Sequence, residues 1–197
     1  ELAAWAISRY EATLVEESKV RRAAAKHRRD AQIHAALYFL DPLLTYSCRG
    51  LTPLDRVALP ILARRTNVVL VLGKSDLLST RQAGRLRRWI ADEIAEENGM
   101  RLYGFAGDAE ETARIDRLLE ELRMMSPFTV GSRAGSAAGG RRAATAFRTF
   151  PWGRADAHNP AHADVGALLH TLLASHRDRL RDITRDVFYE AWRTDKL

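Results

Sequence analysis

The chain has 197 residues and a mass of 22.1 kDa, which is enough for one well-buried domain and too short for two comfortable ones. Its 46% hydrophobic and 28% charged residues exclude a disordered or collagen-like chain, and its formal net charge of +6 favours phosphate, nucleic acid or an acidic membrane face as a partner. The single cysteine, Cys48, excludes an intramolecular disulfide, and no apolar run approaches the roughly 20 residues of a membrane-spanning helix, so we expect a soluble domain in a reducing, intracellular compartment. Since the chain starts at Glu1 and not at Met, we also expect that residues precede it.

The first part of the chain predicts a helix followed by a buried strand. Apolar residues at helical spacing predict an amphipathic helix from Leu2 to about Glu17, which runs into a basic segment. The nearly continuous apolar run from residue 33 to 40 predicts a strand that is buried on both faces. We expect a loop over residues 42–50.

A helix start follows this loop. Thr52 is placed as an N-cap and Pro53 as the first helical residue. Pro60 lies within the pattern and should kink or shorten the helix. The predicted apolar face consists of Leu54, Val57, Ala58, Ile61 and Leu62.

The middle of the chain alternates strands and helices. Residues 67–72 are the strongest strand candidate, and Ser79 with Gln82 forms a capping-box pattern for a helix to about Asn98. Further predicted elements are a strand at 102–105, a helix at about 110–124 and a strand at 128–130. This alternation predicts an α/β fold with a mostly parallel sheet.

The last third contains a loop, a short strand and a long helix. Residues 131–142 are rich in Gly, Ala, Ser and Arg, which is typical of a flexible loop or hairpin tip. Residues 147–152 are expected to re-enter the edge of the sheet. Helical apolar spacing predicts a long helix from Ala163 to about Trp192.

Gly73, Lys74 and Ser75 resemble the end of a phosphate-binding loop, but Val68 stands where that motif needs its first glycine. A strand end with Lys-x-Asp allows a different chemistry, since the carboxylate of Asp76 can accept both N1–H and the exocyclic amine of guanine while the lysine stem covers the ring. Adenine has no matching pair of donors. Taken alone, Lys-x-Asp after a strand is more commonly a helix-capping aspartate.

A succession of short motifs along the chain resembles the septins, the filament-forming GTP-binding cytoskeletal proteins. The most specific are Pro-Trp-Gly at 151–153 and the terminal helix with Ser-His-Arg-Asp at 175–178 and Tyr-Glu at 189–190. The others are Leu-Thr-Pro-Leu-Asp at 51–55, Gly-Lys-Ser-Asp at 73–76 and Val-Gly-Ser at 130–132, together with His162 and Asp164. The resemblance implies a P-loop-GTPase-like three-layer α/β sandwich, with a core of about residues 1–131 and a septin-specific extension of about 132–197.

The resemblance also assigns residues to the nucleotide. Lys74 and Asp76 would be the guanine-specificity pair, Gly131 a backbone contact to the base and Arg148 the base-stacking arginine. A solvated strand-edge position is the alternative for Arg148. The resemblance places Trp152 and His162 in a dimer interface across the nucleotide, and the terminal-helix stripe with Phe188 and Trp192 is a candidate second interface.

Contacts made to a neighbouring subunit are a separate hypothesis. His27 matches a histidine that reaches the partner's nucleotide, and Arg21 or Arg22 could serve as an arginine finger on its phosphates. A solvated basic surface is the alternative for these arginines, and a structural hydrogen bond is the alternative for His27 and His162. Four histidines, 158, 162, 170 and 176, do not form a convincing metal set.

The sequence therefore predicts part of a septin that binds GTP or GDP and assembles with itself or other septins. No GxxxxGK[ST] loop and no Asp-x-x-Gly occurs in the chain, so the resemblance implies that the Mg²⁺ and phosphate ligands precede Glu1 and that this chain alone is inactive. Association with acidic lipids on the inner face of membranes is expected, and nucleic acid is not. Two alternatives stay open: a scaffold that binds nucleotide without turnover, and a basic α/β module that binds nucleic acid.

Overall fold

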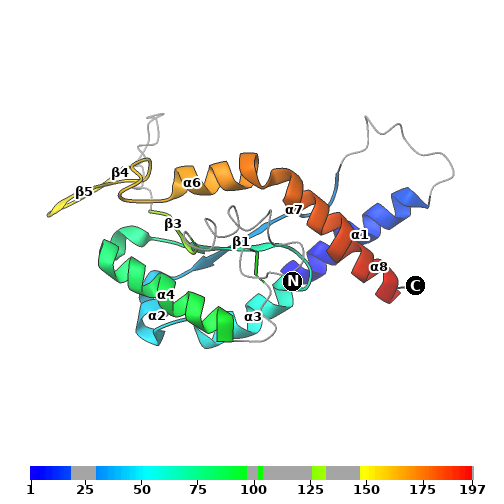
Figure 1. Ribbon diagram of the computed structural model, residues 1–197, viewed down its shortest axis with the longest axis horizontal. Coiled ribbons are helices and arrows are strands. Elements are labelled where there is room, and N and C mark those ends of the chain that lie inside the picture. The colour runs from blue at the N-terminus through cyan, green and yellow to red at the C-terminus, as the bar shows by residue number, and fades with distance from the viewer. Residues whose placement is uncertain (19–29, 97–101, 104–125, 132–146, 197) are drawn as a thin grey trace, which may run out of the picture.

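A three-stranded parallel sheet lies between two layers of helices (Figure 1). The computed structural model describes residues 1–18, 30–96, 102–103, 126–131 and 147–196. Its elements are α1 (Leu2–Glu17), β1 (Ala36–Leu40), α2 (Pro42–Cys48), α3 (Pro53–Ala63), β2 (Val68–Leu72), the 3₁₀ turn η2 (Ser75–Leu77), α4 (Thr80–Glu96), β3 (Phe128–Thr129), β4 (Phe147–Phe150), β5 (Gly153–Asp156), α6 (Val165–His170), the π-helical turn η3 (Thr171–Ser175), α7 (Arg177–Ile183), the π-helical turn η4 (Thr184–Tyr189) and α8 (Glu190–Lys196).

The central strand β2 is buried on both faces. Its side chains at Val68, Leu70 and Leu72 pack with α3 and α4, and those at Val69 and Val71 face the other layer. From that second layer, Leu168 of α6 and Leu180 of α7 join the core, as do Tyr103 and Phe128. The predicted α/β sandwich with a parallel sheet is thus confirmed.

Strand β1 differs from its prediction. It is shorter than the apolar run 33–40 and its side chains alternate between partly buried and exposed, with Leu37 41% and Phe39 59% exposed. Within the described part of the chain, β1 pairs only with β2, so it stands at an edge of this sheet. A continuous apolar run was therefore not evidence of burial on both faces.

The predicted loop at 42–50 contains a helix instead. Asp41 caps α2 by accepting hydrogen bonds from the N–H groups of Leu43 and Leu44, and Pro42 occupies the first helical position. The Asp-Pro pair was the signal for this helix.

Helix α3 begins as predicted, but of the predicted apolar face only Leu62 is buried. Thr52 accepts from the N–H of Asp55, whose carboxylate accepts in return from the N–H of Thr52, completing a capping box. The buried residues are Asp55, Leu59, Leu62 and Ala63, whereas Leu54, Val57 and Ile61 are exposed. The helix continues through Pro60 to Ala63.

Residues 147–152 do not re-enter the main sheet. Strand β4 pairs antiparallel with β5 in a separate hairpin, with Phe150 opposite Gly153. Figure 1 shows this hairpin extending from the edge of the molecule beside α6. Pairing with β5 satisfies the backbone groups of β4 that face its partner, so the strand pattern did not require a place in the large sheet.

The described part of the segment at 102–105, Leu102 and Tyr103, has no strand assignment, although the N–H of Tyr103 donates to the carbonyl of Val68 at 3.2 Å. The predicted helix at 110–124 and nearly all of the predicted loop at 131–142 lie outside the described residues. The predicted strand at 128–130 is confirmed as β3.

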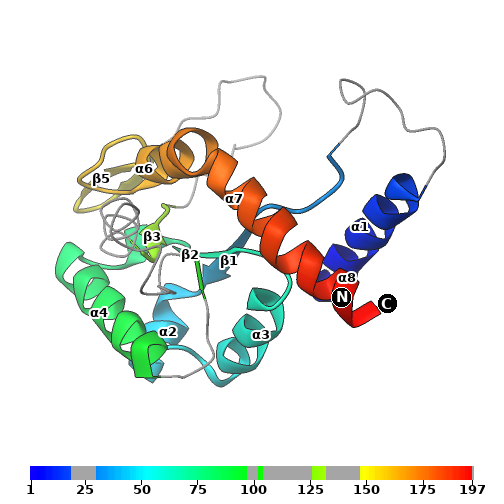
Figure 2. The same ribbon diagram turned by 45° about the vertical axis from the view of Figure 1, so that its right-hand side comes forward.

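The terminal helix crosses the molecule from the hairpin to α1 (Figure 2). It begins with α6 and ends with α8, and His176 interrupts it between η3 and α7. At the far end Tyr189 and Trp192 pack on Tyr10 of α1, with ring centroids 5.8 Å from that of Tyr10 in both cases.

A single amide links three segments of the chain. Asn67, which is 4% exposed, donates through Nδ2 to the carbonyl of His34, the carbonyl of Leu180 and the hydroxyl of Thr184. The distances are 2.8, 3.2 and 3.3 Å. This contact fixes α7 and η4 against the entry to β1 and β2.

Candidate functional site

The predicted base-binding residues follow the carboxyl ends of neighbouring parallel strands. The turn after β2 is held by both neighbours, because Gly73 N–H donates to the carbonyl of Leu40 in β1 and Ser75 N–H donates to the carbonyl of Val130 after β3, each at 3.1 Å. Ligands of open α/β sheets bind at this edge. The fold thus brings Lys74, Asp76 and Gly131 to one edge.

Lys74 has a left-handed backbone, with φ of 49° and ψ of 38°. Non-glycine residues seldom adopt this conformation, and among the described residues only Arg49, the C-cap of α2, shares it. Its ammonium lies 3.9 Å from Oδ2 of Asp41, the carboxylate that follows β1. Asp41 was not among the residues predicted for this edge, although its position directly after a predicted strand and before a proline was a usable signal.

The side chain of Asp76 is 2% exposed and pairs with Arg148, whose NH1 lies 3.1 Å from Oδ2. Arg148 comes from β4 and its side chain is 41% exposed. Two residues that are 72 positions apart in the sequence, both predicted to contact the base, therefore contact each other directly. The cap of α4 is supplied by Ser79, which exchanges hydrogen bonds with Gln82.

Arg148 also begins a row of stacked side chains along the hairpin. Its guanidinium carbon lies 4.8 Å from the ring centroid of Phe150, and Phe150 stacks on Trp152 at 5.0 Å with an interplanar angle of 15°. Trp152 is 80% exposed. The predicted interface tryptophan is thus at the surface, and three successive contacts connect it to the predicted base-reading carboxylate.

The other members of the predicted site lie nearby. Gly131 follows β3, and a Cβ built on it would meet no atom within 4 Å. Nδ1 of His162 accepts the N–H of Asp156 in β5 at 3.1 Å, and the His162 ring is exposed. The structural hydrogen bond that was its alternative role is therefore present.

Asp164, at the start of α6, anchors the end of β3. Its carboxylate accepts from the N–H of Thr129 at 2.8 Å and from the guanidinium of Arg87 in α4. Its own N–H donates to the carbonyl of Thr129 at 2.7 Å, and Arg87 Nε donates to the carbonyl of Pro127. These bonds hold the Gly131 side of the site in place relative to α4 and α6.

A cavity of about 470 Å³ lies between the hairpin and the start of α4. Asp76, Phe150 and Trp152 line it, as do Arg87 and Asp164 of the anchor just described. The cavity thus adjoins the Asp76–Arg148 pair.

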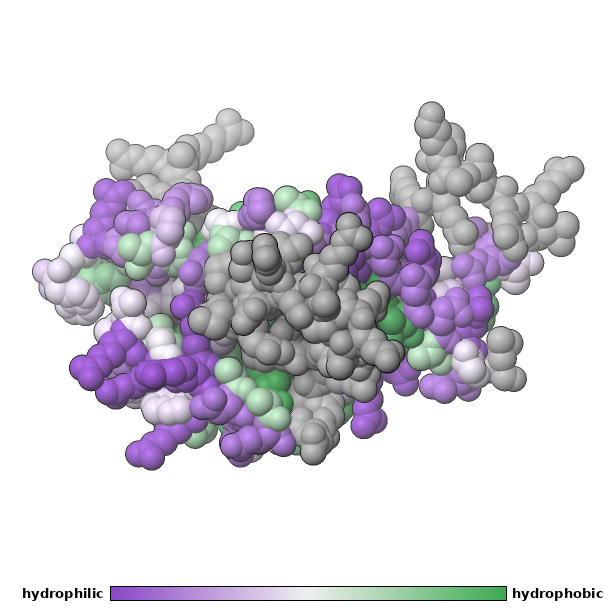
Figure 3. Space-filling model, in the orientation of Figure 1, coloured by the Kyte–Doolittle hydropathy of each residue, from purple (hydrophilic) through white to green (hydrophobic). Residues whose placement is uncertain are grey.

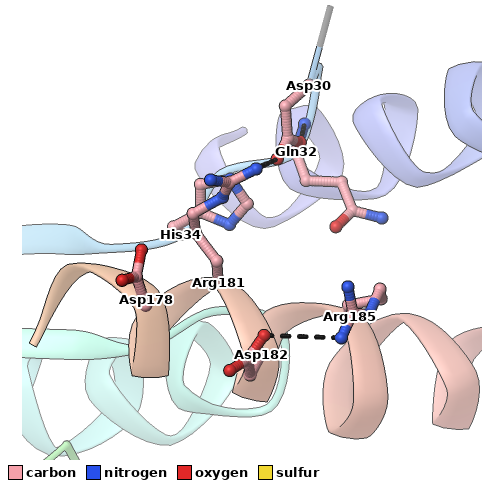
Figure 4. A pocket seen from close by; sticks show the side chains of 7 residues that line it. All are labelled: Asp30, Gln32, His34, Asp178, Arg181, Asp182 and Arg185. Atoms are coloured by element: carbon pink, nitrogen blue, oxygen red, sulfur yellow. Dashed lines mark hydrogen bonds and ion pairs between the residues drawn. The ribbon is translucent and has the colours of Figure 1, made fainter. Parts of the chain in front are cut away.

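A second pocket, of about 240 Å³, lies away from this site where the segment before β1 meets α7 (Figure 4). Arg181 and His34 both contact Oδ2 of Asp30, at 3.2 and 3.0 Å. Burial alone would raise the pKa of Asp30, but the N–H of Gln32 together with His34 and Arg181 outweighs it and lowers that pKa below its usual 3.8. The pocket is lined by Asp30, Gln32, His34, Asp178, Arg181, Asp182 and Arg185.

The remaining predicted residues are placed as follows. Arg21, Arg22 and His27 lie outside the described residues. Trp192 is 5% exposed and packs within the chain on Tyr10, with Phe188 partly buried against the same cluster. Trp192 therefore has little surface left for a partner, and the second-interface role of the pair stays a prediction.

The described residues contain no group of three or more His, Cys, Asp or Glu side chains that could hold a metal ion. None of the helices described is both long and apolar enough to cross a bilayer. On the face seen in Figure 3 the described surface is mostly hydrophilic, with hydrophobic residues in small separate patches.

Comparison with known structures supports the fold. The structure is similar to the septin GTPase domain from Chlamydomonas reinhardtii, with a TM-score of 0.69 and 21% identity, over 98% of this chain and 67% of that chain. It is also similar to Cdc11 from Saccharomyces cerevisiae, with a TM-score of 0.63 and 22% identity, over 100% of this chain and 74% of that one. The chain therefore has the same fold as these two proteins.

Comparison with curated sequences gives the same family. The chain is 34% identical over 194 residues to Septin-2B from Xenopus tropicalis, which covers 96% of this chain and 51% of that protein. It is 32% identical over 196 residues to Protein peanut from Drosophila melanogaster, covering 96% of this chain and 34% of that protein. The chain thus spans about half the length, or less, of these relatives. Since the family model for septins matches residues 2–197, the chain belongs to the septin family.

Proposed function

We propose that this chain reads the guanine base in a septin GTPase that binds GTP or GDP. Asp76 would accept N1–H and the exocyclic amine of the base, while the stem of Lys74 covers one ring face and the backbone of Gly131 contacts the base. The observation that carries this proposal is the Asp76 carboxylate, held at the carboxyl edge of the sheet and paired with a planar N–H donor group, the Arg148 guanidinium. A carboxylate that accepts hydrogen bonds from this donor can also accept them from N1–H and the exocyclic amine of guanine.

We further propose assembly through the hairpin. Trp152 is 80% exposed and lies next to the proposed base site, so a second septin subunit would cover it when two copies meet across the nucleotide. A filament needs a second, different interface, for which the terminal helix is the candidate. In this proposal residues up to about 131 form the GTPase core and the rest the septin-specific extension.

Hydrolysis belongs to the same proposal. GTP would be hydrolysed with Mg²⁺, which supplies charge stabilisation on the phosphates when bound, and the metal ligands would lie outside the described residues. The assembled protein would be cytoskeletal, in the cytoplasm and along the inner face of membranes, where the net charge of +6 suits acidic lipids.

The variant Asp76→Asn tests base recognition. Asn offers an amide donor where the carboxylate offers an acceptor, so GDP should bind about 10–100 times more weakly, from the loss of a charged hydrogen bond. Xanthosine diphosphate should bind more tightly than it does to the wild type, since xanthine has an acceptor where guanine has its amine. Both affinities are measured by calorimetry on the full-length protein.

Asp92→Asn is the matched control, because Asp92 is an exposed residue on α4. Unchanged GDP affinity in Asp76→Asn would remove Asp76 from the base site. A GTP hydrolysis assay of the wild type then separates a GTPase from a scaffold that binds nucleotide without turnover.

A further inference from the structure

We propose that Arg148 competes with the base: its guanidinium pairs with the Asp76 carboxylate, and guanine enters only by displacing it. The inference rests on the proposed function for the identity of the incoming base. The contact can be measured in protein from which nucleotide has been removed, so the two can be tested separately.

The geometry favours competition between Arg148 and the base. NH1 of Arg148 lies 3.1 Å from Oδ2 of Asp76, whose side chain is 2% exposed. A guanidinium and a guanine edge both present N–H groups in one plane to a carboxylate, so they need the same acceptor. With the Asp76 side chain this deeply buried, a base cannot pair with it while the guanidinium stays in place.

When the base displaces Arg148, hydrogen bonds from the base replace the hydrogen bond from the guanidinium. A buried carboxylate that gives up the hydrogen bond from a guanidinium and gains none in exchange pays a desolvation cost. Guanine can meet that cost with its own donors, and adenine cannot, because it lacks the donor pair. Arg148 therefore strengthens selection for guanine, since a base that fails to replace its hydrogen bond leaves the ion pair intact.

The same contact attaches the hairpin to the base site. Arg148 lies over Phe150, and Phe150 stacks on the exposed Trp152. Apart from the ladder between β4 and β5, the hairpin has no pairing with the main sheet among the described residues. When the base displaces Arg148 from Asp76, the guanidinium becomes available to stack on the base. Phe150 and Trp152 are then no longer linked to Asp76 through Arg148.

Amide hydrogen exchange of the nucleotide-free, full-length protein tests the contact. In Asp76→Asn and in Arg148→Met, exchange of the β4–β5 amides should become about tenfold faster. The double variant should be no faster than either single variant, because both remove the same ion pair. Arg154→Met is the matched control, since it removes one charge from β5 without touching Asp76, and its hairpin should exchange like the wild type.

Hairpin exchange at the wild-type rate in both single variants would overturn the proposal. So would additive effects in the double variant, which would mean that the two residues act independently.

The kinetics of association test the competition. The rate at which a fluorescent GDP analogue binds the wild type should reach a plateau with concentration, set by release of Arg148, whereas in Arg148→Met it should rise linearly. Loss of base stacking in that variant would act on dissociation and not on this plateau. A linear dependence in both proteins would refute the competition. Failure of the wild type to bind any guanine nucleotide would refute the proposed function. The hydrogen-exchange experiment would still test the contact between Arg148 and Asp76, because it is made without nucleotide.

Discussion

Removing the carboxylate of Asp55 should destabilise the protein by about 3 kcal/mol. Asp55 is 8% exposed and accepts three hydrogen bonds, from the hydroxyl of Tyr38 at 2.7 Å and from the N–H and hydroxyl of Thr52 at 3.0 and 2.7 Å. Asp55→Ala removes the capping box of α3, which costs about 1 kcal/mol. It also leaves the Tyr38 hydroxyl without this acceptor, which costs about 2 kcal/mol more.

The control is Tyr38→Phe, which removes the hydroxyl and leaves the capping box intact. It should cost about 1 kcal/mol, and the double variant should cost less than the sum of the two. Urea unfolding followed by circular dichroism measures all three, and 3 kcal/mol corresponds to a melting temperature lower by about 6–12 °C. Strictly additive effects would contradict the hydrogen bond between Tyr38 and Asp55, and a cost below 1 kcal/mol for Asp55→Ala would contradict the burial argument.

The Tyr38 hydroxyl also predicts a dependence on alkaline pH. Burial, and then the hydrogen bond to Asp55, raise the pKa of Tyr38 above its usual 10.0. The stability that the neutral phenol contributes is therefore present below pH 10 and is lost as the pH rises through the raised pKa. In Tyr38→Phe this part of the alkaline loss should be absent from the pH dependence of the urea midpoint.

Three further substitutions should lower the stability, raise the stability and shift a pKa, respectively. Gly50→Ala should destabilise by about 1–2 kcal/mol in urea unfolding, because its Cβ would lie 2.2 Å from Oε2 of Glu93 and force that carboxylate away from the backbone it accepts from. Gly84→Ala, inside α4 with nothing within 4 Å of the new Cβ, should stabilise by about 0.5–1 kcal/mol in the same assay. The lowered pKa of Asp30 means that its stabilising contribution is present above about pH 4 and is lost as the pH falls through the lowered value. Arg181→Met should move that pKa upward in a carbon-detected NMR titration, and an unmoved pKa would contradict the contact.

Several elements were predictable because their signals are local. The Thr52 cap and the Ser79–Gln82 capping box depend on residues three apart, and both appear in the structure. The strand at 68–72 was predictable because burial on both faces requires an unbroken apolar run in the centre of a sheet.

Other features depend on what lies across the fold. In α3 the apolar residues Leu54, Val57 and Ile61 made a plausible inner face, but the sheet and α4 receive the opposite side, on which Asp55 is buried because Tyr38 and Thr52 satisfy its oxygens. No spacing rule within the helix contains that information.

For the candidate site, the residue types came from the resemblance and their arrangement came from the structure. Lys74 and Asp76 were expected after β2, and Arg148 was expected at a base. That Arg148 pairs with Asp76 itself could not be predicted, because the hairpin leaves the main sheet and the direction in which it leaves is set by contacts that are distant in sequence.

The side chain of Asn67 has a consequence for how the protein is made. Its amide needs acceptors at Leu180 and Thr184, 113 and 117 residues further along the chain. A ribosome that adds about 5–20 residues per second therefore exposes β2 for seconds before those acceptors leave the exit tunnel. During that interval the face of β2 that carries Val69 and Val71 lacks its cover of Leu168 and Leu180, so translation pausing between residues 67 and 184 should lengthen the period in which this apolar face is exposed.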